Sequence, residues 1–376
     1  AGYEKYATVT GTVTIKVKPA KLTVSVKASS AYYNGEAQIA SIIASGQSVD
    51  STPVTFTYSD KVDGNYTSGG PTFTDAGTYT VYYKAEAANH EPATGTFPVT
   101  IDPLPISLFS VSSISKTYDG SADVTLTADK LTFLSKTAKI KLPDTALSFS
   151  DAQFTSKQAD GSYLPSPEVG GGKALSFTMT LTSNNYVFEG KSEGTVSDVF
   201  ATDDVNRFTI TKAAAPGSGL HPAVTVINDL AKTYEMVLSN DYLPKLSSPC
   251  EYGTVSYSLR GTYLTDGYKD TVQVKVMEEN GQYKLKLTVP AVDYNKVSSV
   301  GTIDVRVTSD NYRDFYLTIG VKTKNKDVPV PDGPISASDI TYGQALNDSK
   351  IAGKMKAGGK AIDGTFTWTN GTFKPA

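Results

Sequence analysis

Side chains that could carry catalytic or metal chemistry are scarce in this sequence. It contains two histidines, His90 and His221, and one cysteine, Cys250. His221 ends a flexible Gly/Ala/Ser segment, where a site is hard to preorganise. His90 stands where similar phrases carry tyrosine, which favours a packing role. We therefore expect neither a Ser-His-Asp triad nor a histidine-rich zinc site, and we interpret Cys250 as an incidental thiol.

Carboxylates are more frequent, and composition alone leaves a glycosidase-type pair open. The oxygen-rich segments 60–65 and 203–206 could hold Ca²⁺, but neither has the twelve-residue loop that ends in glutamate. Turn chemistry explains both more simply. The glycine run 170–172 lacks the Lys-Ser/Thr of a phosphate loop. We predict no catalytic residue, no metal ligand and no cofactor.

Charge and hydropathy exclude two further classes of partner. The 376 residues include 35 basic and 38 acidic side chains, for a net charge of −3, and the lysines are dispersed. Nucleic-acid binders usually carry a clustered basic surface, so we expect no nucleic acid. No apolar run approaches the roughly 18 residues that span a membrane, so we expect no membrane insertion. A single cysteine excludes an intramolecular disulfide.

The sequence predicts that the secondary-structure elements of this chain are mainly β-strands. Apolar and polar residues alternate in segments such as 54–58, 272–276 and 303–307, which is typical of a strand with one buried face. Asn280-Gly281 lies between two such segments and predicts a tight hairpin turn. Residues 230–243 are the one place where we expect a short helix.

Two short phrases recur along the chain. An opening phrase places a tyrosine before a turn, and a closing phrase pairs asparagine with an aromatic side chain. The opening copies are Tyr33-Asn34-Gly35, Tyr118-Asp119-Gly120, Thr233-Tyr234 and Tyr342-Gly343. The closing copies are Asn89-His90, Asn185-Tyr186 and Asn311-Tyr312, and residues 2–6 carry a variant with Gly2-Tyr3 in place of the asparagine pair. The opening tyrosines recur about every 85 to 115 residues, which suits small β-sandwich domains.

The order of these phrases predicts an all-β chain of tandem immunoglobulin-like antiparallel β-sandwich modules in an elongated array. Short Pro-rich or Gly-rich segments separate the modules and favour spaced neighbours. We expect the terminal strand of a preceding repeat at 1–18, sandwiches at 19–103, 104–213 and 220–325, linkers at 214–219 and 326–334, and the start of a truncated repeat at 335–376.

Six residues are predicted to have structural roles. Asp75, Gly77 and Tyr79 have the spacing of an immunoglobulin-like corner, in which a buried tyrosine hydroxyl bonds to nearby backbone. Val81 would then replace the usual disulfide cysteine with aliphatic packing. Tyr118, Asp119 and Gly120 are expected to form a tight turn with the tyrosine packed beside it. Recurrence favours a role in the fold over a ligand site.

The first module, from Tyr33-Asn34-Gly35 through residues 71–79 to Gly95-Thr96, resembles the MBG-type repeats of bacterial surface proteins. The second, with Tyr118-Asp119-Gly120 and Asn185-Tyr186, resembles the YDG-type repeats found beside them. Residues 335–376 again resemble the start of an MBG-type repeat, whereas the third module matches only loosely. The resemblance implies large exported adhesins or cell-wall proteins built from β-rich modules.

Two functions fit these observations. The first is a non-catalytic structural or adhesive stalk segment of a large bacterial cell-surface or secreted protein, located outside the cell, at the surface or in the wall. The alternative is a set of carbohydrate-binding modules attached to an adhesin or a polysaccharide-degrading enzyme. Burial of most tyrosines would favour the stalk, and a tyrosine cluster on one exposed face would favour sugar binding. We expect a monomer with weak, multivalent affinity for glycans or surface proteins.

Overall fold

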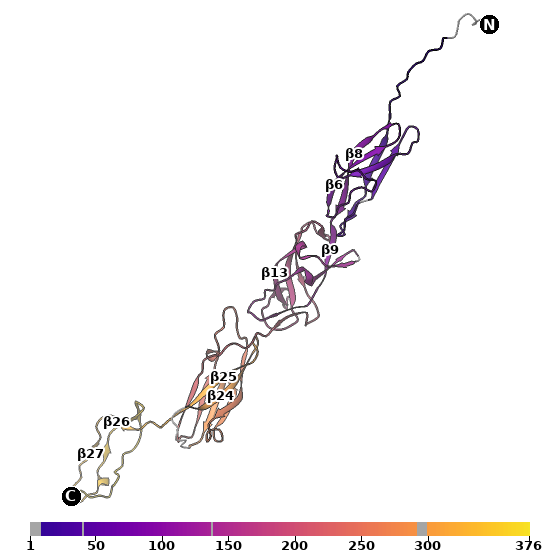
Figure 1. Ribbon diagram of the computed structural model, residues 1–376. Coiled ribbons are helices and arrows are strands. Elements are labelled where there is room, and N and C mark those ends of the chain that lie inside the picture. The colour runs from indigo at the N-terminus through magenta and orange to yellow at the C-terminus, as the bar shows by residue number, and fades with distance from the viewer. Residues whose placement is uncertain (1–8, 40, 137, 292–298) are drawn as a thin grey trace. The chain divides into compact units, whose positions relative to one another are not determined.

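The computed structural model describes residues 9–39, 41–136, 138–291 and 299–376 (Figure 1). Within these residues the regular elements are β-strands and four short 3₁₀ turns of three residues each. The prediction of an all-β chain of immunoglobulin-like sandwiches is confirmed. No helix in the described part of the chain has the length and apolar character to cross a membrane. The chain divides into two units, Ala1–Lys116 with Ser121–Ile210, and Thr117–Gly120 with Thr211–Ala376.

The first predicted sandwich contains a four-stranded sheet and a two-stranded sheet with a shared core. The larger sheet has the order β3 (Ala31–Tyr32), β8 (Ala93–Asp102), β6 (Gly77–Glu86), β5 (Thr55–Ser59), and the smaller pairs β2 (Thr23–Ala28) with β4 (Ile42–Gln47). A further parallel pair joins β1 (Ala20–Lys21) to β7 (His90–Glu91). Tyr58, Val81, Phe97 and Val99 form the buried core.

Residues 9–18 repeat the apolar pattern of β8 without a partner strand. Their segment Gly11–Ile15 corresponds to Gly95–Val99 of β8. Val99 is fully buried, whereas Ile15, at the matching position, is 78% exposed. The described residues 9–18 carry no strand, since a strand needs a paired neighbour to satisfy its backbone. The rest of the expected closing phrase, at residues 2–6, lies outside the described residues.

The second predicted sandwich consists of two four-stranded sheets and one strand pair. One sheet has the order β12 (Ala138–Ile140), β11 (Leu131–Ser135), β9 (Leu104–Val111), β16 (Tyr186–Phe188). The other has the order β14 (Tyr163–Pro165), β13 (Leu147–Lys157), β15 (Ala174–Leu181), β17 (Thr195–Phe200). β10 (Ile114–Thr117) pairs with β18 (Phe208–Thr211). Phe133, Phe154, Phe177 and Phe208 are fully buried, so large aromatic side chains fill this interior.

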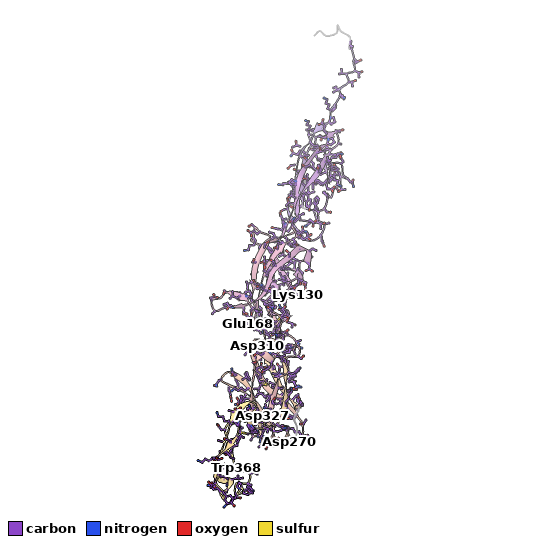
Figure 2. All side chains as sticks on the ribbon, turned by 90° about the vertical axis from the view of Figure 1, so that its left-hand side faces the viewer. Lys130, Glu168, Asp270, Asp310, Asp327 and Trp368 are labelled. Carbon is purple, nitrogen blue, oxygen red and sulfur yellow. The ribbon has the colours of Figure 1, made fainter. Side chains whose placement is uncertain are left out.

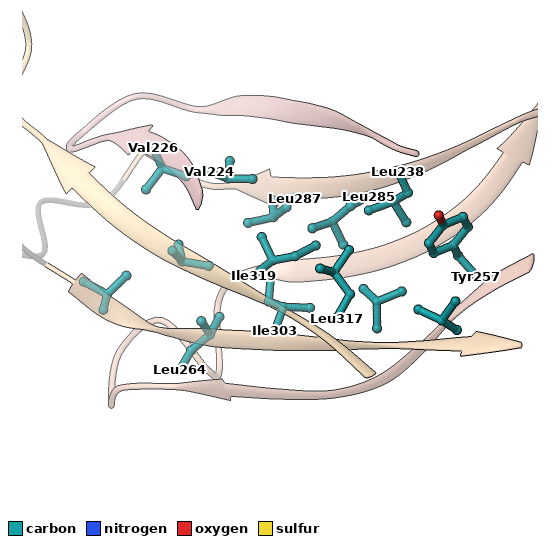
Figure 3. Packing of buried hydrophobic residues seen from close by; sticks show 14 of the residues in the cluster. Val224, Val226, Leu238, Tyr257, Leu264, Leu285, Leu287, Ile303, Leu317 and Ile319 are labelled. Carbon is teal, nitrogen blue, oxygen red and sulfur yellow. The ribbon is translucent and has the colours of Figure 1, made fainter. Parts of the chain in front are cut away.

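The third predicted sandwich packs a four-stranded sheet against a three-stranded one. The first has the order β19 (Ala223–Ile227), β25 (Phe315–Lys324), β24 (Ser299–Ser309), β21 (Val255–Leu264), and the second β20 (Lys232–Leu238), β23 (Gln282–Val289), β22 (Gln273–Glu279). Figure 3 shows Leu285 and Leu287 of β23 facing Ile303 and Ile319 of the other sheet. Along each strand they alternate with residues that are less buried, so one face of each sheet forms the core.

The expected helix at 230–243 is wrong. That segment forms β20 and a 3₁₀ turn at Asn240–Tyr242. β20 pairs along its whole length with β23, and tertiary strand pairing overrides the weak helical preference of its residues. The hairpin turn at Asn280-Gly281 is confirmed, with φ angles of 52° and 74° between β22 and β23.

The last part of the chain has two small sheets. Strands β26 (Val330–Pro331), β29 (Met355–Ala357) and β30 (Lys360–Ile362) form one of them, and β27 (Ser336–Ala337) pairs with β28 (Ile351–Ala352). Trp368, labelled in Figure 2, donates its indole N–H to the Ser349 carbonyl at 3.2 Å. The lone tryptophan therefore helps to hold this segment together.

Candidate functional site: the tyrosine joints

The predicted corner is present at the start of β6. The Tyr79 hydroxyl donates to the Asp75 carbonyl at 2.8 Å, and the ring of Tyr79 stacks on Phe73 with centroids 4.0 Å apart. The Tyr79 ring also lies against Gly77, where an added Cβ would be in ordinary van der Waals contact at 3.5 Å. Val81, two residues further on, is fully buried in the core.

The expectation that Tyr79 is buried is wrong, because its side chain is only half-buried. The acceptor carbonyl belongs to an exposed turn just upstream, so the ring lies along that turn and does not enter the sandwich. The hydroxyl bond thus fixes the turn that precedes β6, and the core is closed by the aliphatic side chain of Val81.

The first tyrosine joint lies within the first unit and brings an opening phrase onto a closing phrase. The ring of Tyr33 meets that of Tyr186 edge to face, with centroids 5.3 Å apart and an interplanar angle of 79°. The pKa of Tyr186 is raised to about 12, mainly by burial and to a smaller extent by the proximity of Tyr33. Beside them the ammonium group of Lys136 lies 3.7 Å from the centroid of Tyr32. Edge-to-face aromatic pairs contribute about 0.5–1.5 kcal/mol beyond their buried area.

Asn185 adds an amide clamp to the first joint. Its Oδ1 accepts the Ala76 N–H at 2.7 Å, and its Nδ2 donates to Asp75 Oδ1 at 3.0 Å. These two hydrogen bonds therefore hold the same turn that the Tyr79 hydroxyl holds through Asp75. Donor and acceptor of one amide are both used, which defines position and orientation together. The first joint joins residues of the first and second predicted sandwiches.

The second tyrosine joint lies within the second unit and repeats the aromatic pair. Tyr118 and Tyr312 meet edge to face with centroids 5.8 Å apart and an interplanar angle of 78°. The Tyr118 hydroxyl accepts the Glu251 N–H at 3.0 Å, and Tyr252 packs on Tyr312 at 5.5 Å. Burial, assisted by the neighbouring Cys250 thiol, raises the pKa of Tyr312 well above its ordinary value.

Gly120 makes the second joint possible by its lack of a side chain. Its φ of +80° belongs to the left-handed region, and an added Cβ would lie 2.9 Å from the backbone nitrogen of Cys250. The turn of the opening phrase therefore contacts the facing backbone directly. Gly35 of the first joint has a similar φ of +83°. Both glycines adopt the positive φ that their sequence context predicts.

The closing phrases of the first two predicted sandwiches also anchor the first strand of the same sandwich. A backbone N–H of that strand donates to the asparagine carbonyl, and the aromatic residue after the asparagine pairs in parallel with the donor residue. The third copy makes the same contacts with Ala213, the last residue of the second predicted sandwich. The bonds run from Ala20 to Asn89 at 3.1 Å, from Leu104 to Asn185 at 2.9 Å and from Ala213 to Asn311 at 2.9 Å. His90 stands opposite Ala20, as Tyr186 stands opposite Leu104. The position of His90 thus matches that of the tyrosines, and its ring is buried.

The other candidates do not come together as a site. His221 is exposed, and Cys250 is partly exposed against the Gly120 turn. Within the described residues, no three His, Cys, Asp or Glu side chains gather as they would around a metal ion. A groove of about 560 Å³ in the last part of the chain is lined by Met355, Ile362 and Phe366, with Lys354 and Asp363 as its ionisable groups.

No protein-family model matches the chain, and no curated protein matches it. Solved structures with similar chains include protocadherin gamma B2 extracellular cadherin domains 1–5, with 10% identity over 80% of this chain and 59% of that one, at a TM-score of 0.28. The human desmocollin-1 ectodomain has 14% identity over 90% and 65%, at 0.26. Sidekick-1 immunoglobulin domains 1–5 have 12% identity over 82% and 60%, at 0.24. This chain thus spans less than two thirds of each of these longer chains.

Proposed function

We propose that this chain is a non-catalytic stalk segment of a large bacterial cell-surface or secreted protein, outside the cell. The observation that supports this proposal is the repeated tyrosine joint. Two of the opening tyrosines, Tyr33 and Tyr118, lie against the closing tyrosines Tyr186 and Tyr312, which supports a role in the array for these four residues. The resemblance to MBG-type and YDG-type repeats supports the same function and the bacterial surface location.

A stalk must hold successive modules in a defined relation, and the first joint has the parts to do so. Tyr33 and Tyr186 supply an aromatic contact, and Asn185 supplies two hydrogen bonds to Asp75 and Ala76. Each hydrogen bond contributes about 0.5–1.5 kcal/mol net. Summed with the aromatic pair, the joint is strong enough to restrict the movement of one sandwich against the next without one large apolar interface.

Adhesion by such a segment would be weak for each module and would rise with the number of modules. Shallow sheet faces give few buried contacts, whereas tandem modules raise the effective concentration of every further contact. The partners we propose are glycans or surface proteins, bound by a monomeric chain. No cofactor is part of this proposal.

Small-angle X-ray scattering of the 376-residue chain tests the proposal. A compact globule of this length would have a radius of gyration near ~21 Å. The stalk requires a clearly larger value and a pair-distance distribution with a long tail. Parallel turnover assays on common polysaccharides should show no hydrolysis. A radius near the compact value, or turnover abolished by changing one carboxylate, would contradict it.

Carbohydrate binding remains the second candidate, and the exposure of the tyrosines bears on it. Among the described residues, the tyrosines with exposed side chains are Tyr32, Tyr263, Tyr316 and Tyr342. The others are half-buried or buried, which favours the stalk for most of the chain. Tyr263 and Tyr316 are different, because both belong to one sheet of the third predicted sandwich.

A further inference from the structure

The outer face of the sheet β19–β25–β24–β21 combines exposed aromatic and charged side chains. Along β24, Ile303, Val305 and Val307 are fully buried, so the alternate residues Asp304 and Arg306 point away from the core. The strand register continues this outer face on both sides. We call it the Tyr–Arg face, and its members are Arg260, Tyr263, Asp304, Arg306, Tyr316 and Thr318.

The centre of the Tyr–Arg face is an ordered polar network. Asp304 accepts from Thr318 Oγ1 at 2.9 Å and pairs with Arg260 Nη1 at 3.4 Å. The guanidinium of Arg260 lies 3.8 Å from the centroid of Tyr316, which fixes that cation over the ring. Arg306 Nε bonds the Asp314 carboxylate at 2.8 Å. These groups are held in place before any ligand arrives.

A bulge in β21 places Arg260 and Tyr263 on this face. The pairing with β24 shifts between Leu259 and Gly261, so one extra residue enters the strand. Such bulges redirect side chains at sheet edges. An added Cβ on Gly261 would lie 3.3 Å from the Tyr263 hydroxyl, so the Tyr263 ring extends over bare backbone.

Two aromatic rings therefore flank the network. Tyr263 is 57% exposed and Tyr316 is 48% exposed. Tyr263 stands opposite Thr302 and Tyr316 opposite Arg306, four residues apart on β24. At about 3.4 Å per residue their backbone positions are offset by about 14 Å along the strands, on the two strands that flank β24. An elongated ligand could contact both rings and the polar groups between them.

We propose that the Tyr–Arg face binds an uncharged polysaccharide chain. Arg260 and Arg306 are each paired with a carboxylate, so the charges within the network balance. A sugar ring offers an apolar face to an aromatic ring and hydroxyl groups to arginine and aspartate. The core of a protein–protein interface is enriched in tyrosine and arginine but depleted of aspartate, whereas Asp304 lies at the centre of this face. The proposal does not depend on the stalk function.

Affinity electrophoresis of the full 376-residue chain tests this proposal. Native gels would contain mannan, galactan, starch or β-glucan, with alginate and heparin as charged polymers. At least one neutral polymer should retard the chain. Tyr263→Ala and Tyr316→Ala should each raise the dissociation constant about tenfold, the scale of an aromatic hot spot. Tyr342→Ala is the matched control, since Tyr342 is 90% exposed and lies elsewhere, and it should change nothing.

Thermal unfolding of each variant would show that the sandwich is intact, as expected for exposed side chains. The proposal is wrong if no neutral polymer retards the chain, or if the double variant Tyr263→Ala/Tyr316→Ala binds like the wild type. Retardation by alginate or heparin alone, lost on adding salt, would also overturn it, because that would be electrostatic binding. Binding of a protein partner through Tyr263, with no glycan binding, would also overturn the proposal.

Discussion

Replacement of Asn185 by aspartate would turn the amide clamp of the first joint into a pair of like charges. In the wild-type chain Asn185 Nδ2 donates to Asp75 Oδ1 at 3.0 Å. In Asn185→Asp that donor becomes a carboxylate oxygen beside the Asp75 carboxylate. Two unit charges at this distance repel by about 1.4 kcal/mol at the dielectric constant of water. The lost hydrogen bond adds about 1 kcal/mol, so we expect a destabilisation of about 2 kcal/mol at pH 7.

The cost of Asn185→Asp should depend on pH with a definite sign. The like-charge pair raises the pKa of one carboxyl in the folded variant above its value in the unfolded chain. The folded variant then binds a proton more tightly, so stability is regained as the pH falls and is lost as the pH rises through that raised pKa. The protonated carboxyl can also donate to its neighbour, as the amide does. The deficit should shrink between about pH 5 and pH 3.5.

Differential scanning calorimetry of the full chain measures this effect. For about 200 residues, 2 kcal/mol corresponds to a shift of about 4–8 °C in the midpoint of the transition to which the joint contributes. Asn184→Asp, at the exposed neighbouring position, is the control for added charge. Asn185→Ala should cost about 1–2 kcal/mol without the pH dependence. Equal midpoints for Asn185→Asp and Asn184→Asp at pH 7, or a deficit that persists at pH 3.5, would refute the clamp.

Three further predictions concern single side chains. Tyr79→Phe should lower the free energy of unfolding by about 0.5–1 kcal/mol in urea titrations, because the lost bond is at a half-buried site; an unchanged midpoint would argue against the corner. Gly120→Ala should cost about 2 kcal/mol more than Gly343→Ala in the same titrations, since both have positive φ but only Gly120 has facing backbone at 2.9 Å; equal costs would disprove the close approach. Hydrogen bonding from Lys286, and to a smaller extent from Lys284, lowers the pKa of Glu279 below 4.5. The stability that ionised Glu279 gives to the folded state is therefore lost as the pH falls through that lowered pKa. Glu279→Gln should therefore flatten the acid side of the stability profile, and an unaltered profile would contradict the pairing.

Much of the fold follows from local sequence patterns. Alternation at 303–307 predicts a strand with one buried face, and Ile303, Val305 and Val307 are fully buried. Asn280-Gly281 predicts its turn because positive φ is accessible to few residue types. The strand at 232–238 is missed, since its partner β23 lies some 50 residues away and local preference cannot reveal that pairing.

The sequence predicts the residues of the tyrosine joints but not the contacts between them. Recurrence identifies the opening and closing phrases, and asparagine beside tyrosine is the signal that marks them. Recurrence does not say that Tyr33 contacts Tyr186 or that Asn185 bonds Asp75, since these contacts span more than 100 residues. The Tyr–Arg face was missed for a related reason. Its members come from three strands, and a bulge that no local pattern predicts brings Arg260 beside Asp304.

The proposal that the first tyrosine joint holds the first and second predicted sandwiches in a fixed relation is tested most directly by a distance distribution across that joint. Spin labels at Lys27→Cys and Ser148→Cys, both exposed strand positions, would be placed in a Cys250→Ser chain and measured by double electron–electron resonance. The account predicts one narrow distribution for the wild-type joint and a broad one for Tyr33→Ala/Asn185→Ala. A distribution that is already broad with the joint intact, and unchanged by the double substitution, would contradict it.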